Sequence, residues 1–316
     1  MSKKQKHNFL AIYNEYLIIR RRKLKDQSFQ TFKYNFEANI LSYFSKMNIE
    51  DISENDIYNW EDFIVEKNFC NNHNKNLFSM LKDFFAYCNY KYNIDDRIIC
   101  DVGPIRPKVE RKKKDFYTFN EFNQFINYVD NNIYKQFFNL MFFCGTRPGE
   151  AMALKFSDLN DNTISIIKTI DEHGKRKIDT PKTLSSIRDI IIDDNLKNDL
   201  LELKKYYIKK YNNKKYDYFI FGGMKPLSAT TINRYKLEAC EKANIRPITL
   251  HQFRHSHATL LLNQNIDIHV ISKRLGHSKV STTLDIYTHA NLEQEKRVYD
   301  TLNSLRTNNI PITTSI

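Results

Sequence analysis

Apolar residues among the first hundred positions recur at intervals of three and four, as on one face of an α-helix. Four segments have this spacing, at residues 9–17, 29–44, 57–64 and 77–88. Ser53 and Asp56 precede the third segment with the spacing of a capping box, although the acid is one carbon shorter than the usual Glu. The pattern predicts a helical domain whose many aromatic residues form its core rather than a platform for stacked bases.

In the rest of the chain, apolar residues have helical spacing at both ends and alternate with polar residues in between. Residues 119–144 and the chain from Leu196 onward have helical spacing, and a last helix is predicted at residues 291–305. Three segments around a turn at His173-Gly174 predict strands, at residues 163–170, 177–180 and 187–192. We therefore expect a mainly α fold with a small antiparallel β-sheet, the second domain being of the α+β kind.

Gly103, Pro104 and Pro107 interrupt the helical pattern after the first domain. Six basic residues that cannot be buried lie in the same stretch: Arg106, Lys108, Arg111, Lys112, Lys113 and Lys114. We expect a helical domain, a basic linker, a second domain and a tail, at residues 1–103, 104–115, 116–305 and 306–316. Such a linker either lies along a DNA backbone or is an ordinary solvated segment, and the sequence leaves both open.

The formal net charge of +12 over 316 residues indicates a polyanionic partner, with nucleic acid the leading candidate. The alternative is that the positive charge serves solubility alone. The five cysteines form no CxxC pair, which argues against a disulfide framework or a zinc site and suits a reducing cytosol. The densest apolar segment, residues 137–144, is too short to span a bilayer, so we expect a cytoplasmic protein with no membrane segment.

The first candidate for chemistry is Arg147, in the stretch GTRPGE at residues 145–150. It lies beside residues that break a helix, so its side chain could reach a cleft. Glu150, three residues later, could hold the guanidinium or a neighbouring histidine in place. Alone, this arrangement is more often a surface salt bridge.

The second candidate is Lys182, which lies between two predicted strands. A lysine at a hairpin tip can swing onto DNA, and a desolvated lysine can donate a proton. Alone, it is more often a solvated charge.

The third candidate is the pair His251 and Arg254, whose spacing of three places them on one face of a helix. Thr249 is a plausible N-cap, and a phosphate near this helix start would meet free N–H groups. We expect structural roles for the neighbouring His255 and His257.

The fourth candidate combines His277 with Tyr287. Gly276 can end a helix in the left-handed conformation, and Ser281 can cap the helix that carries Tyr287. Among 19 tyrosines, Tyr287 stands out because it falls ten residues after His277.

These residue types suit cleavage of a phosphodiester. Two arginines can clamp the charged oxygens of the transition state. The reaction also needs a nucleophile, a base and an acid for the leaving group. A phosphotyrosine link would keep the bond energy, so that strands could rejoin without ATP. The sequence offers no carboxylate cluster typical of two-metal sites, and we expect no cofactor.

The ordered set resembles that of the tyrosine recombinase, or lambda integrase-like, family: Arg147, Lys182, His251, Arg254, His277 and Tyr287. The matching stretches are GTRPGEAMALKFSDL, TPKTLSSIRDI, TLHQFRHSHATLLL and RLGHSKVSTTLDIYTHA, and the resemblance runs from about residue 116 to the C-terminal helix. It implies a site-specific DNA recombinase or integrase that works without metal.

The resemblance also implies individual roles. Arg147 and Arg254 would bind the scissile phosphate, with Glu150 organising the site. His277 would hydrogen-bond the phosphate or support the transition state. His251 would be the general base, and Lys182 would be the acid that protonates the departing 5′-oxygen. Tyr287 would be the nucleophile that forms a 3′-phosphotyrosyl link.

The first domain resembles the family's helical SAM-like core-binding domain, which with the catalytic domain would clamp duplex DNA. The expected architecture is Xer-like, without an arm-binding domain. The basic linker residues are expected DNA contacts: Lys108, Arg111, Lys112, Lys113 and Lys114. The family also implies a homotetramer on two DNA sites, with an accessory protein or a second recombinase as further candidate partners.

Two other functions remain open. A type IB topoisomerase or telomere resolvase would use the same chemistry, and relaxation of DNA without a sequence requirement would favour it. A DNA-binding module without catalysis would suit the charge but would not need Tyr287, both arginines and Lys182 together.

Overall fold

The computed structural model describes residues 6–101, 115–170, 178–179, 184–281 and 283–284. The chain divides into two compact units, Met1–Lys112 and Lys113–Ile316, and each is described by itself. The boundary between them falls within the expected linker. The linker, the turn at residues 173–174, the predicted helix at 291–305 and the tail lie outside the described residues.

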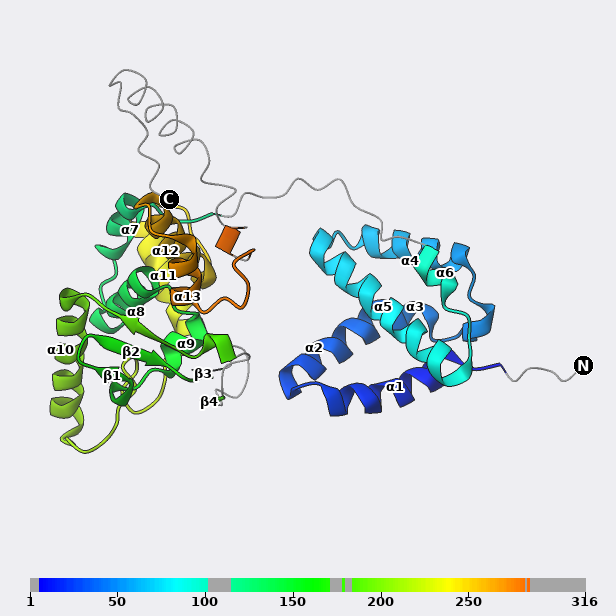
Figure 1. Cartoon of the computed structure of the whole chain (residues 1–316), viewed down its shortest axis with the longest axis horizontal. Coiled ribbons are helices and arrows are strands. Elements are labelled where there is room, and N and C mark those ends of the chain that lie inside the picture. The colour runs from blue at the N-terminus through cyan, green and yellow to red at the C-terminus, as the bar shows by residue number, and fades with distance from the viewer. Residues whose placement is uncertain (1–5, 102–114, 171–177, 180–183, 282, 285–316) are drawn as a thin grey trace, which may run out of the picture. The chain divides into compact units, whose positions relative to one another are not determined.

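The first unit is helical in all its regular elements among the described residues (Figure 1). Its helices are α1 (Phe9–Lys23), α2 (Asp26–Phe36), α3 (Ser42–Phe44), α4 (Glu54–Glu66), α5 (Asn71–Tyr92) and α6 (Arg97–Asp101). The predicted capping box is present, since Ser53 and Asp56 exchange side-chain and backbone hydrogen bonds at the start of α4. The aromatic core is also confirmed: the rings of Phe9, Phe36 and Phe84 are buried in mutual contact.

The predicted helix over residues 29–44 contains a wider turn, because Glu37–Leu41 is π-helical. Such a turn breaks the regular helical hydrogen-bond ladder, and buried carbonyls need partners. Trp60 Nε1 donates to the Asn39 carbonyl over 2.8 Å, and Lys67 Nζ donates to the Ala38 carbonyl over 3.1 Å. Side chains of α4 and its C-cap thus hold this irregular turn.

The second unit combines helices with two small antiparallel sheets (Figure 1). The helices are α7 (Phe119–Ile126), α8 (Asn132–Cys144), α9 (Pro148–Ala153), α10 (Asp194–Tyr211), α11 (Ala229–Lys242), α12 (Leu250–Asn263) and α13 (Ile268–Leu275). The strands are β1 (Leu159–Asn160), β2 (Thr163–Ile166), β3 (Thr169–Ile170), β4 (Ile178–Asp179) and β5 (Arg188–Ile191). The expected mainly α fold with a small antiparallel sheet is therefore confirmed.

Two predicted elements are divided in the structure. The strand expected at 163–170 is two strands: β2 pairs with β1 and β5, whereas β3 pairs with β4. The helical stretch at 119–144 is α7 and α8, separated by residues 127–131. Apolar periodicity continues across such breaks because both flanking elements pack on the same core.

Helix α12 of the second unit packs against α8 and α13. Phe253 of α12 stacks on Phe138 of α8 at a centroid distance of 5.4 Å. This packing places the ends of three helices close together: the start of α9, the end of α8 and the end of α13. Among the described residues, no helix is long and apolar enough to cross a membrane.

Candidate active site

Arg147 lies at the junction between α8 and α9, where the backbone turns sharply. Gly145 ends α8 in the left-handed conformation, with φ of 63°, and Arg147 is the N-cap of α9. A Cβ on Gly145 would lie 2.5 Å from Cδ2 of His257, so the turn excludes a larger residue. The predicted helix break is present, and the Arg147 side chain is 33% exposed.

Glu150 lies one turn into α9 and is only 2% exposed. It accepts hydrogen bonds from the Arg147 backbone N–H over 2.9 Å and from Arg147 Nη1 over 2.6 Å. Arg188 of β5 donates to both carboxylate oxygens, Nη1 over 3.2 Å and Nη2 over 2.9 Å. Burial opposes ionisation, but the Arg188 hydrogen bonds and the charges of Arg188 and Arg147 keep the pKa of Glu150 below its ordinary value.

Arg254 of α12 is 1% exposed and hydrogen-bonds to the ends of two other helices. Nη1 donates to the Gly145 carbonyl over 2.8 Å, and Nη2 donates to the Leu275 carbonyl over 2.6 Å. Burial, followed by the charges of Arg147 and Arg188, lowers the pKa of Arg254 to about 9. The guanidinium remains charged at neutral pH, in a strongly positive surrounding.

The end of α13 meets three arginines. The carbonyls of Arg274, Leu275 and Gly276 accept hydrogen bonds over 2.7, 2.6 and 3.2 Å. Their donors are Arg188 Nε, Arg254 Nη2 and Arg147 Nη2 respectively. The last carbonyls of a helix lack partners within it and carry partial negative charge, so they suit guanidinium donors.

His277 directly follows this helix end. Gly276 ends α13 with φ of 69°, and the N–H of His277 donates to the Ser272 carbonyl over 3.1 Å. Its ring Nδ1 lies 2.8 Å from Oγ1 of Thr283, a fully buried residue. Burial, together with the charges of Arg254 and Arg147, lowers the pKa of His277 to about 3, so the ring is neutral at pH 7.

His251 lies at the start of α12, where Thr249 is the N-cap as predicted and its backbone N–H donates to Gln252 Oε1 over 2.5 Å. Its side chain is exposed, and its ring is 5.1 Å from that of His255 in an edge arrangement. The charge of His251 also acts on the pKa of His277, which places the two histidines in one electrostatic environment. Because Arg254, three residues after His251, donates to the Leu275 carbonyl, the first turns of α12 lie next to the end of α13.

His257 is 2% exposed and lies between α8 and α13. Nδ1 is 2.9 Å from the Phe142 carbonyl, and Arg274 Nε donates to Nε2 over 3.3 Å. The carbonyl can only accept and the guanidinium can only donate, so the ring is neutral with its proton on Nδ1. Burial and the charge of Arg274 lower its pKa to about 3, which agrees with the expected structural role.

Two of the expected catalytic residues, Lys182 and Tyr287, lie outside the described residues. The expected linker contacts lie there too: Lys108, Arg111, Lys112, Lys113 and Lys114. Described residues close to them in sequence do reach the site, since Ser186 Oγ is 3.4 Å from Arg147 Nη1 and Thr283 contacts His277. The structure thus brings together Arg147, Glu150, Arg254 and His277.

Three site residues received no role from the sequence: Arg188, Arg274 and Thr283. Their partners lie 38, 17 and 6 residues away along the chain, at Glu150, His257 and His277. All three belong to motif stretches quoted above, which was the one available signal.

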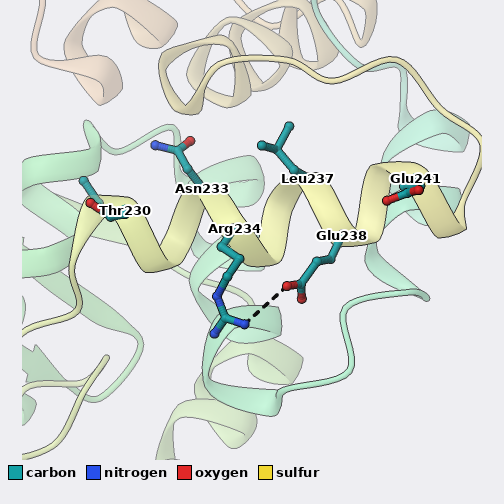
Figure 2. Close-up of a pocket in the computed structure, with 7 residues that line it drawn as sticks. Thr230, Asn233, Arg234, Leu237, Glu238 and Glu241 are labelled. Atoms are coloured by element: carbon teal, nitrogen blue, oxygen red, sulfur yellow. Dashed lines mark hydrogen bonds and ion pairs between the residues drawn. The ribbon is translucent and has the colours of Figure 1, made fainter.

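A shallow pocket elsewhere in the second unit lies along the outer face of α11 (Figure 2). An exposed Leu237 and the ion pair of Arg234 with Glu238 line it. No expected catalytic residue lines this pocket. Among the described residues, no group of three or more His, Cys, Asp or Glu side chains could hold a metal ion.

Comparison with known proteins gives matches over both units. The profile of the phage integrase family matches residues 115–294, and that of the phage integrase N-terminal SAM-like domain matches residues 8–64. The ICEBs1 integrase of Bacillus subtilis (strain 168) is 31% identical over 295 residues, which are 89% of this chain and 78% of the relative. A tyrosine recombinase XerD of Rickettsia bellii is 22% identical over 304 residues, 89% of this chain and 94% of the relative.

Solved structures share the fold. The Tn1549 transposon integrase in complex with transposon right end DNA matches 94% of this chain and 99% of its own, with a TM-score of 0.76 and 18% identity. A lambda integrase dimer bound to a COC' core site matches 90% of this chain and 97% of its own, with a TM-score of 0.68 and 17% identity.

Proposed function

Because this chain belongs to the phage integrase family of tyrosine recombinases, we propose that Arg147 and Arg254 bind the scissile phosphate of duplex DNA while Tyr287 attacks it. The enzyme is a site-specific DNA recombinase.

The excess of positive charge at the site carries the proposal. Four arginines surround the junction of α8, α9 and α13: Arg147, Arg188, Arg254 and Arg274. Among the described residues, Glu150 is the one carboxylate hydrogen-bonded to any of them. Burial, and after it the positive charges of Arg147 and Arg188, lower the pKa of Arg254, so these charges repel one another. A phosphodiester anion would relieve that repulsion, and its transition state, which carries more charge on its oxygens, would relieve it further.

Arg147 and Arg254 have donors left for this anion. A guanidinium has five N–H groups, and Arg254 uses two of them on protein carbonyls. Arg147 is partly exposed, and its guanidinium uses no more than three on described residues. Both can therefore hold a phosphate without releasing the helix ends that position them.

His277 acts as a neutral hydrogen-bond donor in this proposal. When the Thr283 hydroxyl donates to Nδ1, the ring proton resides on Nε2, which is then free to donate to a phosphate oxygen. A neutral donor adds no charge to a site that is already strongly positive.

Proton transfer falls to His251 and Lys182. His251 takes the proton of Tyr287 as its oxygen bonds to phosphorus, and Lys182 gives a proton to the departing 5′-oxygen. The bond from phosphorus to the 5′-oxygen breaks as the 3′-phosphotyrosyl bond forms, so the bond energy is kept, and a 5′-hydroxyl of another strand reverses the same steps. These roles rest on the match of residue types and order to the family.

DNA is the partner, and we propose further that the first unit is the core-binding domain and that the basic linker follows the DNA backbone. The match to the SAM-like domain supports the first assignment. A homotetramer on two DNA sites is the proposed active assembly. A lambda integrase tetramer bound to a Holliday junction, which shares the fold at a TM-score of 0.68, supports it.

Recombination of plasmid DNA tests the proposed function. Two copies of the DNA that flanks the coding sequence of this chain would be placed on one supercoiled plasmid in EDTA. Site-dependent inversion or deletion is expected. Relaxation of any plasmid without recombination would instead indicate a topoisomerase, and tight binding without any strand exchange would favour a binding module.

A further inference from the structure

Arg188 contacts three parts of the site through one guanidinium. Nε donates to the Arg274 carbonyl over 2.7 Å, and Nη1 donates to the Ser186 carbonyl over 2.9 Å. Nη1 and Nη2 also donate to the two oxygens of Glu150. The side chain is 6% exposed, and four of its five N–H groups are used within the protein. Arg188 is therefore not available as a phosphate ligand, unlike Arg147.

The position of Arg188 on β5 ties the sheet to both walls of the site. Its backbone pairs with Ile166 of β2, and its side chain reaches α9 through Glu150 and α13 through Arg274. The fit against α13 is tight: a Cβ on Gly276 would lie 3.1 Å from Cδ of Arg188 and 2.9 Å from the Ser185 carbonyl. The sheet and two helix ends thus meet at one side chain.

We propose that Arg188 is a positioning residue for strand cleavage: through Glu150 it orients Arg147, and through the end of α13 it orients His277. The inference rests on the proposed function, because it concerns the phosphate site assigned there.

Arg147 and Arg188 share the carboxylate of Glu150, and this sharing is the reason that Arg188 can affect Arg147. A buried carboxylate with one partner would draw that partner fully onto itself, since burial makes an unpaired charge costly. With Arg188 satisfying both oxygens, Arg147 needs only part of its donors for Glu150 and can present the others to phosphate. A change of about 1 Å in such a group can slow a reaction by roughly 100-fold.

A purely structural role for Arg188 predicts a different result. In that case its loss would lower stability but leave the chemistry of folded molecules and its dependence on pH unchanged. The pH dependence separates the two, because Arg188 helps to keep Glu150 ionised. The charged groups acting around Glu150 are Arg147 at the start of its own helix, Arg188 from β5 and Arg254 from α12.

The test uses the full chain and a nicked duplex that traps the cleaved strand. Single-turnover formation of an SDS-resistant adduct would be measured from about pH 5 to 9, with the thermal midpoint and DNA affinity of each variant. Arg188→Gln removes the charge, whereas Arg188→Lys keeps it without the fork of donors. Arg246→Gln is the matched control, because Arg246 pairs with Glu121 and Asp115 away from the site.

Arg188→Gln is expected to cleave about 100-fold more slowly at neutral pH. In its pH–rate profile, the loss of rate on the acid side should begin at higher pH than in the wild type, because Glu150 is then protonated more easily. Arg188→Lys should keep the wild-type acid limb with a rate about tenfold lower. Arg246→Gln should match the wild type in both. If Arg188→Gln does not fold, Arg188→Lys decides alone: a wild-type rate would overturn the inference.

The inference is also overturned if folded Arg188→Gln keeps the wild-type rate and pH profile with only a lower thermal midpoint. Failure of the proposed function looks different. The wild type would then form no adduct on a site that it recombines, or Tyr287→Phe would still form one.

Discussion

Arg254 donates a hydrogen bond from Nη2 to the backbone carbonyl of Leu275 over 2.6 Å. This contact links α12, which carries His251, to the end of α13, which leads through Gly276 to His277. Because the same guanidinium also donates to the Gly145 carbonyl, two helix ends depend on one side chain. A residue assigned to phosphate binding is thus also part of the scaffold, so its substitutions need readouts of both stability and chemistry.

Replacing Arg147 by Ala should slow strand cleavage by about 100- to 1000-fold, because a donor to the transition state is lost. DNA affinity should change little, since one phosphate contact among several disappears. Adduct formation and gel-shift titration measure the two effects, with Arg246→Ala as the control. A parallel loss of binding and cleavage would instead make Arg147 an ordinary DNA contact.

Replacing Gly276 by Ala should destabilise the second unit and also impair cleavage. The position has φ of 69°, and a Cβ would meet the Ser185 carbonyl at 2.9 Å. A cost of about 2 kcal/mol or more in the free energy of unfolding follows from backbone strain and the clash. Gly223→Ala is the matched control, because Gly223 also has positive φ but contacts Tyr207 and Tyr211. It should lose stability while its folded fraction keeps the wild-type cleavage rate.

Folding stability should fall in acid partly because of His257. Its pKa is about 3 in the folded protein, below the ordinary value of 6.5. The unfolded chain therefore binds the proton first, so this contribution is complete above about pH 6.5 and is lost as the pH falls toward 3. The loss is about 1 kcal/mol per pH unit. Denaturant unfolding at several pH values gives the free energy of unfolding as a function of pH. This free energy should fall less steeply in acid for His257→Gln than for the wild type, whereas replacing the exposed His269 by Gln should leave the pH dependence unchanged.

DNA binding should weaken steeply with salt. If six or more phosphates are contacted, affinity should fall by about a thousandfold between roughly 50 and 200 mM salt. Replacing Lys112, Lys113 and Lys114 together by Gln should reduce the slope of log affinity against log salt if the linker lies on the backbone. An unchanged slope would favour an ordinary solvated linker.

The sequence predicted the parts of the site that depend on local spacing. Arg147 at a helix break, Glu150 three residues later and Gly276 at a helix end all follow from patterns within one turn. The helices of the first unit and their aromatic core were equally predictable, because amphipathic periodicity directly reflects burial.

Contacts between distant segments were not predictable. Arg188 and Arg274 contact Glu150 and His257 only because β5, α9, α12 and α13 pack together, and no spacing in the sequence encodes that approach. The end of α13 as an acceptor for three arginines has the same origin. Likewise, the division of residues 163–170 into β2 and β3 depends on which neighbouring strand each half pairs with.

The most direct test of the central claim is covalent trapping on the recombined site. A nicked duplex carrying that site would be incubated with the wild type and with Tyr287→Phe in EDTA, and the products would be resolved in SDS. The account predicts an adduct with the wild type alone, joined to a 3′-phosphate through a peptide that contains Tyr287. An adduct that persists in Tyr287→Phe, or that forms only with Mg²⁺, would contradict it.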